Sequence, residues 1–195
     1  MLKLSTDTAA PAAMSVMDAI YERRSVRSYL PMTVDRAFVK NLLDAAVQAP
    51  TAVHEEPWAF AVVQDRAALR RLSDKALRML QPEAVPASFA LPENVFYDAG
   101  TLIVIYGKPL GPFVPADCWL AAENLMLAAR AMGLGTCVTG LAAAALNTPE
   151  WKKELKVPEG LRAYAPIIVG VPAALTPATG RREAEVLAWK TGLSV

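Results

Sequence analysis

Three arginines and a serine lie within five positions, in the run Arg23-Arg24-Ser25-Val26-Arg27. Guanidinium groups stay charged at any working pH, and their fork of donors matches the oxygens of a phosphate. The run therefore indicates an anion-binding site. Cations at the end of a helix also favour the helix dipole without any ligand, and spacing alone does not decide between these two interpretations.

A second segment, residues 50–58, runs from the proline that ends a predicted helix to the proline that precedes a predicted strand. The chain between Pro50 and Pro57 must turn with exposed backbone groups and small side chains, so it can approach a flat ligand closely. His54 is the only histidine, so it has no second histidine with which to bind zinc or non-haem iron. We expect Glu55 and Glu56 to face solvent.

Together these segments resemble the nitroreductase family of FMN-dependent oxidoreductases. The family has an Arg-Arg-Ser-x-Arg segment followed by an aromatic residue, and later a Pro-[Ser/Thr]-x-x-Asn-x-x-Pro-Trp segment; residues 23–29 and 50–58 match them. A long helix ending in Gly133-Leu134-Gly135 and the strand at Ile167–Pro172 match as well. One such motif would be weak, but four in the family's order, over roughly residues 15–190, are specific.

The resemblance implies an FMN site, and its residues carry over position by position. Those expected at the ribityl chain and phosphate are Arg23, Arg24, Ser25 and Arg27. Those expected along the flavin of the other subunit are Pro50, Thr51, Ala52 and His54. A backbone amide near flavin N5 is expected around Val138, Thr139 and Gly140. A basic pair, Arg181 and Arg182, is expected to reach the phosphate; without the resemblance it would be interpreted as a basic tail.

The family also implies a fold and a reaction. The fold is an α+β sandwich with a small, mostly antiparallel sheet surrounded by helices, in a homodimer that exchanges terminal segments and holds two FMN at its interface. The reaction is ping-pong transfer from NAD(P)H to nitroaromatics, quinones or similar acceptors. Bound flavin supplies the hydride or electrons, so no protein nucleophile or metal is needed. Alternatives are flavin storage or breakdown, reductive dehalogenation, and a structural dimer without flavin.

The sequence departs from the family at His54, where the family usually has asparagine. An amide and a neutral imidazole can both donate and accept, but with different reach, so His54 is expected to face either the flavin or the substrate. The chain is also short for the family. Residues 81–94, with prolines at 82, 86 and 92, are the candidate for a lid over the site.

Composition limits the remaining possibilities. The 195 residues can form one domain, for which we expect an exposed arm at 1–14 and a single domain at 15–195. The formal net charge of +1 gives no basic footprint for nucleic acid, and no run of apolar residues is long enough to span a membrane. Cys118 and Cys137 fit no disulfide framework and are expected to be reduced core residues of a cytoplasmic protein.

Apolar spacing predicts the elements that must position these residues. Helices are expected from Ser15 to Arg23–Arg24, from an N-cap at Thr33 to before Pro50, and from Thr148. Two further helices are expected, one at Arg66–Leu80 with Asp65 as its N-cap and one at Ala116–Met132. The latter is apolar almost all round, with Trp119 and Met126 in the core. Strands are expected at Ala59–Val63, Thr101–Tyr106, Cys137–Thr139 and Ala163–Val171. Helices and strands do not alternate as βαβ units, so the sequence indicates an α+β fold.

Overall fold

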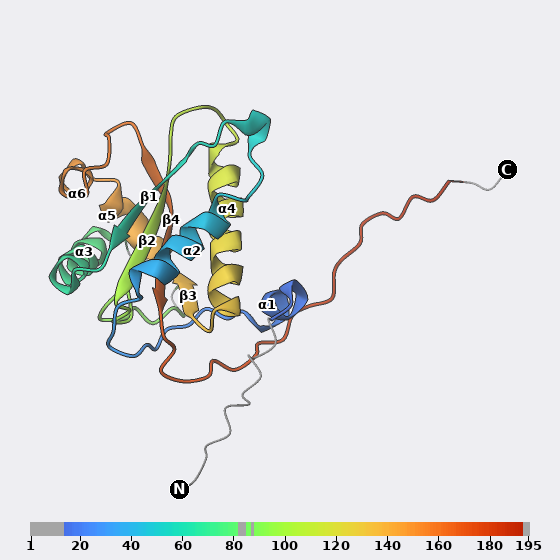
Figure 1. The fold of residues 1–195 in the computed structure, drawn as a ribbon, viewed down its shortest axis with the longest axis horizontal. Helices are drawn as coiled ribbons and strands as arrows, with labels where there is room; N and C mark the ends of the chain where they lie inside the picture. Colours follow the sequence, from blue (N-terminus) through green and yellow to red (C-terminus); the bar gives the residue numbers. More distant parts are fainter. Residues whose placement is uncertain (1–13, 82–84, 87, 193–195) are drawn as a thin grey trace, which may run out of the picture.

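A four-stranded antiparallel sheet forms the centre of the computed structural model, which describes residues 14–81, 85–86 and 88–192 (Figure 1). The strands are β1 (Trp58–Val63), β2 (Thr101–Gly107), β3 (Gly135–Val138) and β4 (Arg162–Gly170), in the spatial order β1-β2-β4-β3. Each neighbouring pair is antiparallel. This arrangement confirms the predicted α+β fold with a small antiparallel sheet, and each predicted strand is present to within about two residues, the usual scatter at element ends.

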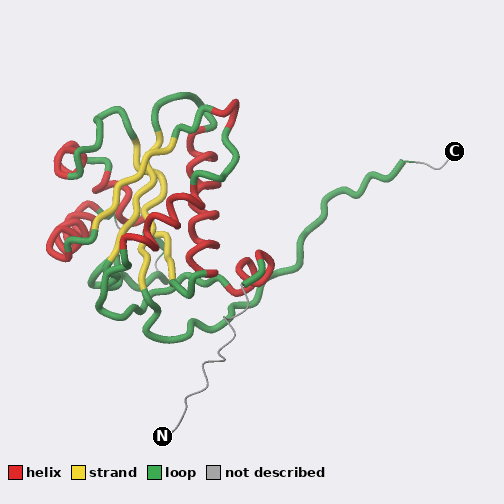
Figure 2. The backbone as a smooth tube through the Cα atoms, in the orientation of Figure 1, coloured by secondary structure: helices red, strands yellow, loops and turns green. Residues whose placement is uncertain are grey.

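Helices cover both faces of the sheet, so the body has three layers (Figures 1 and 2). One face packs against α2 (Arg36–Ala46) and α4 (Val114–Ala131), and the other against α3 (Arg66–Met79), α5 (Ala143–Leu146) and α6 (Pro149–Glu154). Side chains of a strand alternate between its two faces. Ile103 and Ile105 of β2 accordingly join the α2–α4 core, whereas Leu102, Val104 and Tyr106 join the α3–α5 core.

Side-chain caps explain where several helices begin. The short helix α1 (Val16–Glu22) starts after Ser15, whose hydroxyl accepts the backbone N–H of Asp18 at 3.1 Å. Asp65 caps α3 and Thr148 caps α6 in the same way, as expected. The predicted cap of α2 at Thr33 is wrong, because Asp35 caps that helix instead. The reason is that the backbone N–H of buried Val34 donates to Thr101 Oγ1 (3.1 Å), which keeps the chain extended until it has passed the sheet.

The predicted long helix is present as α4, and Gly133 follows it with φ +75°, the left-handed conformation that favours glycine. Met126 is buried as expected, but Trp119 is 44% exposed in the single chain, so its assignment to the core is wrong. Helix α4 has apolar residues on more sides than one chain covers.

The sequence did not predict three short elements, because they are too short for a periodic pattern. They are the 3-10 turns η1 (Ala52–His54) and η3 (Gly140–Ala142) and the four-residue helix α5.

The C-terminal segment from residue 173 to 192 contains no helix or strand. It first runs beside the body, where the N–H of Ala173 donates to the carbonyl of Ser28 at 3.0 Å, and then extends away from it (Figures 1 and 2). Three of its large apolar side chains face solvent: Leu175, Leu187 and Trp189 are 97%, 89% and 82% exposed.

Both cysteines are buried and free, as predicted. Among the described residues, no helix has the length and apolar character required to cross a membrane.

Candidate cofactor site

Two apolar residues, Val26 within the arginine run and Tyr29 just after it, fix the run to the sheet. Val26 donates its N–H to the carbonyl of Thr136 at 2.9 Å, and Tyr29 donates its hydroxyl to the carbonyl of Val26 at 2.7 Å. Both side chains are buried against the sheet at glycines. A Cβ on Gly135 would lie 2.8 Å from Val26, and one on Gly170 would lie 2.7 Å from the Tyr29 ring. Because Val26 and Tyr29 point inward, Ser25 and Arg27 are left at the surface.

The three arginines of the run have different surroundings. Arg24 donates through Nη1 to the carbonyls of Tyr21 and Arg23, both at 2.7 Å, so it satisfies the C-terminal end of α1. Arg23 pairs with Glu123 of α4, with 3.3 Å between Nε and Oε1. Arg27 forms no hydrogen bond or ion pair with any residue that the structure describes. The helix-end interpretation of the run thus applies to Arg24, whereas anion binding remains a prediction, for which Arg27 has no competing partner among the described residues.

Arg27 lines a cavity of about 310 Å³ at the end of β3. Its remaining walls are mostly apolar side chains and backbone, and this cavity brings the first predicted segment together with the predicted turn after β3. The other lining residues are Val85, Pro86, Phe89, Val95, Tyr97, Cys137, Val138, Thr139, Gly140 and Leu141. Three residues of the expected lid, Val85, Pro86 and Phe89, thus line this cavity; residues 82–84 and 87 lie outside the described residues.

The backbone donors at the end of β3 are not equivalent. Thr139 donates its N–H to the carbonyl of Pro166 at 2.9 Å, and its hydroxyl donates to the same carbonyl at 3.4 Å. Val138 is paired with Ile167 in the sheet. The N–H of Gly140 has no acceptor among the described residues, and a Cβ built on Gly140 would meet nothing within 4 Å. Of the three predicted positions, Gly140 therefore presents its backbone to open space.

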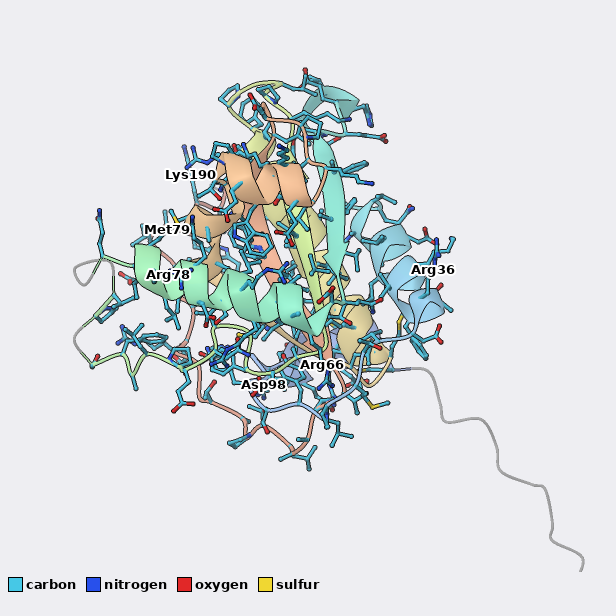
Figure 3. All side chains as sticks on the ribbon, turned by 90° about the vertical axis from the view of Figure 1, so that its left-hand side faces the viewer. Arg36, Arg66, Arg78, Met79, Asp98 and Lys190 are labelled. Atoms are coloured by element: carbon cyan, nitrogen blue, oxygen red, sulfur yellow. The ribbon has the colours of Figure 1, made fainter. Side chains whose placement is uncertain are left out.

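Tyr97 reaches the cavity from a strained turn between α3 and β2. Tyr97 and Asp98 both have positive φ, 50° and 57°. Such conformations cost about 1–3 kcal/mol each and persist only where the surroundings impose them. Asn94 imposes this one, since its side chain accepts the N–H of Phe96 (2.9 Å) and donates to Asp98 (2.8 Å). Figure 3 shows Asp98 in the loop beneath α3, whose ends are marked by Arg66 and by Arg78 and Met79.

Charge near the cavity acts on Cys137. Burial raises the pKa of the Cys137 thiol, whereas Arg27, a hydrogen bond with the Ser25 side chain, and Arg23 act to lower it. Burial also raises the pKa of Tyr29, and Arg27 opposes that rise. The structure therefore brings Arg23, Ser25 and Arg27 close to the thiol at the cavity wall. A group that carries negative charge would meet the same cations.

The second predicted segment lies at the other end of α4. The backbone N–H of Ala52 donates to Oδ1 of buried Asp117 in the first turn of α4 (3.1 Å), whereas Glu22 of α1 pairs with Arg130 in the last turn. Asp117 and Arg130 are thirteen positions apart in α4, which is about 20 Å at the rise of an α-helix. Figure 1 shows η1 and α1 beside opposite ends of α4. One chain therefore does not bring His54 to the cavity beside Arg27.

The turn at η1 is itself strained and exposed. Val53, His54 and Glu56 have φ of 46°, 58° and 46°, in a region that β-branched residues rarely adopt. His54, Glu55 and Glu56 are exposed, and the prediction for the two glutamates is confirmed. Pro50 is also exposed, and Thr51 accepts the N–H of Glu56 at 3.4 Å.

Arg181 and Arg182 lie on the C-terminal segment, and both are exposed. Arg181 donates to Thr179 at 3.2 Å.

Sequence reasoning missed Tyr97 and Asp117. For Asp117 a signal existed, because it is a carboxylate in the first turn of a mostly apolar helix pattern. For Tyr97 there was none, since its role depends on a turn without a sequence period.

Comparisons with known proteins agree with this geometry. The sequence profile of the Nitroreductase family matches residues 20–171. A protein of Archaeoglobus fulgidus, provisionally named an NADH dehydrogenase/NAD(P)H nitroreductase, is 31% identical over 158 residues, which cover 78% of this chain and 83% of that protein. A protein of Methanothermobacter thermautotrophicus with the same provisional name is 30% identical, covering 82% of this chain and 78% of its own length. The crystal structure of a nitroreductase with bound FMN from Bacteroides fragilis has a TM-score of 0.78 at 24% identity, over 91% of this chain and 100% of that one.

Proposed function

Because the chain belongs to the nitroreductase family, we propose that it is an FMN-dependent oxidoreductase that uses NAD(P)H to reduce nitroaromatics, quinones or similar organic acceptors by ping-pong turnover. The observation that carries the proposal is the cavity at the end of β3, where the free cation Arg27 faces the open backbone of Gly140 across apolar walls. The provisional name of two relatives, NADH dehydrogenase/NAD(P)H nitroreductase, supports the same class of reaction.

The donor set of the cavity fits FMN. A flat tricyclic ring needs apolar walls, which Val95, Leu141 and the backbone of Val138 supply. Its polar edge and its phosphate need cations and N–H donors, for which Arg27, Ser25 and the N–H of Gly140 are available. When bound, FMN supplies a ring that takes up and gives away a hydride or single electrons.

The chain's own residues then have three tasks. Arg27 presents a positive charge to a ring that is anionic when reduced, which is stabilising where water is excluded. Gly140 lines the cavity without a side chain, so its backbone N–H would be available to the bound cofactor. Val85, Pro86 and Phe89 would exclude water from one side, and burial of the Cys137 thiol at the cavity wall raises its pKa.

A homodimer completes the site in this proposal. Pro50, Thr51, Ala52 and His54 lie near the far end of α4, so only a second copy can bring them to the cavity beside Arg27. Apolar side chains that one chain leaves exposed would be covered in such a dimer; they include Val16, Met17, Tyr21, Trp119, Leu187 and Trp189. The exposed segment from residue 173 is long enough to reach across a second copy and carry Arg181 and Arg182 to a phosphate. The two buried thiols support a cytoplasmic location.

The test begins with colour. Purified protein should take up FMN, and NADH or NADPH added without oxygen should bleach the flavin absorbance. Nitroaromatics or quinones, added afterwards as a panel of acceptors, should restore it. Protein that takes up no FMN would contradict the proposal. Protein that takes up FMN but is bleached by neither nucleotide would instead favour flavin storage, flavin breakdown or dehalogenation within the same fold.

A further inference from the structure

Arg27 depends on its surroundings for a defined position. Its side chain is long, its residue is exposed, and it has no hydrogen-bond or ion-pair partner among the described residues. The contact that orients its guanidinium is the ring of Tyr97, whose centroid lies 5.9 Å from Cζ of Arg27. This distance is within the range in which a cation is attracted to an aromatic face.

Tyr97 is held from behind, independently of any ligand. The two residues before it, Val95 and Phe96, are 1% and 0% exposed, and the N–H of Val95 donates to Ser73 Oγ at 3.0 Å. The left-handed conformation at Tyr97 and Asp98 then turns the chain toward β2 and leaves the Tyr97 side chain at the cavity wall. The orientation of the ring is therefore set by the fold, which is the property required of a residue that positions another.

We propose that Tyr97 is a positioning residue of the cofactor site, which holds the Arg27 guanidinium at the wall of the cavity before the cofactor binds. The inference rests on the proposed FMN site. It has two consequences. First, a guanidinium that is already in place raises the affinity for FMN, because it need not be ordered on binding. Second, the positive charge stays beside the ring, where it favours the anionic reduced form.

The chain supplies a matched control. Arg162 Cζ lies 5.8 Å from the ring centroid of Tyr164, a pair of the same kind at nearly the same distance, and neither residue lines the cavity beside Arg27. Tyr164→Leu therefore removes an equivalent ring elsewhere. Tyr97→Phe retains the ring face and removes only the hydroxyl, whereas Tyr97→Leu removes the ring.

The experiment titrates apoprotein with FMN and measures the midpoint potential of the bound flavin for the wild type and these three variants. We expect Tyr97→Leu to weaken FMN binding about three- to thirtyfold and to make the potential more negative. Tyr97→Phe should stay within about twofold of the wild type, because a phenyl face also attracts a cation, and Tyr164→Leu should bind like the wild type.

Wild-type affinity and potential in Tyr97→Leu would overturn the inference, and so would Tyr97→Phe binding as weakly as Tyr97→Leu, since the hydroxyl and not the ring would then matter. Wild-type protein that takes up no FMN would overturn the proposed function as well, which separates the two failures. If Tyr97→Leu does not fold, Asn94→Ala releases the strained turn and retains the ring. Folded Asn94→Ala with unchanged affinity and potential would likewise overturn the inference.

Discussion

The backbone N–H of Ala52 donates to the buried carboxylate of Asp117 at 3.1 Å. This bond ties the strained turn at η1 to the first turn of α4, where a negative charge is also favoured by the helix dipole. Residues 53, 54 and 56 all have positive φ, so the turn needs such an anchor to keep one conformation. Through this hydrogen bond, helix α4 fixes the position of the second predicted flavin segment.

Asp117→Ala should therefore loosen the turn. Loss of the acceptor is expected to cost about 1–2 kcal/mol of unfolding free energy, measured by urea denaturation of the apoprotein, and to speed the dissociation of FMN. Asp117→Asn retains an acceptor oxygen at the same place and should remain close to the wild type in both measurements. Unchanged FMN dissociation in Asp117→Ala would show that the turn does not contact the cofactor.

Arg27→Ala and Arg24→Ala should have opposite profiles. Arg27 faces the cavity, so its loss should weaken FMN binding tenfold or more, by analogy with about 1.5–3 kcal/mol for a hydrogen bond to a charged group, with little effect on apoprotein melting. Arg24 caps α1, so its loss should lower the melting temperature more than it lowers affinity. Parallel calorimetry and FMN titration of both variants measure this. Equal losses of stability and affinity in Arg27→Ala would support a purely structural role for the run.

Removal of residues 177–195 should convert a dimer into a species of half the mass in sedimentation experiments, because the exposed apolar side chains of that segment lose their partner surface. The body of the subunit should keep its far-UV circular dichroism, since the described part of the segment, residues 177–192, contains no helix or strand. The double variant Arg181→Ala/Arg182→Ala serves as the control: it should stay dimeric and bind FMN more weakly. A truncated protein that remains dimeric would contradict the exchange of C-terminal segments.

Stability should fall in alkaline solution. Burial raises the pKa of the Cys118 thiol from about 9 to about 12, with the neighbouring Asp117 acting in the same direction, and burial raises the pKa of Tyr106 to about 12. Since the unfolded chain releases these protons first, this part of the stability is complete below pH 9 and is lost as the pH rises toward 12. Urea unfolding between pH 8 and 10.5 should show the decline. Cys118→Ala should decline less steeply, and an identical slope would refute the assignment to that thiol.

Much of the fold was predictable because its elements carry strong local signals. The buried strand at 101–107 and the apolar pattern of α4 both indicated their structure directly, and Ser15, Asp65 and Thr148 were placed correctly as helix caps. The start of α2 was missed because Thr101, distant in sequence, holds Val34. A tertiary hydrogen bond of this kind leaves no local pattern.

The candidate site was predictable only in part, for a related reason. Arg23, Ser25 and Arg27 were identified by type and spacing, and the alternation of Val26 and Tyr29 with these residues explains how they reach the surface. Arg24 and Arg27 have different surroundings because Arg24 lies beside the carbonyls of Tyr21 and Arg23, whereas Arg27 lines the cavity at the end of β3. The exposure of Trp119 likewise depends on what surrounds α4 rather than on the helix pattern.

Helix α4 also constrains how this chain can change during evolution. One end of the helix anchors the turn at η1 and the other adjoins the arginine run, so in the proposed dimer its length sets the spacing between two cofactor sites. An insertion of one residue would rotate one end by about 100° relative to the other, because a turn has about 3.6 residues. The connection between α3 and β2 has, among its described residues, no helix that links two sites in this way. Variation in length among homologous proteins should therefore accumulate in that connection and be absent from α4.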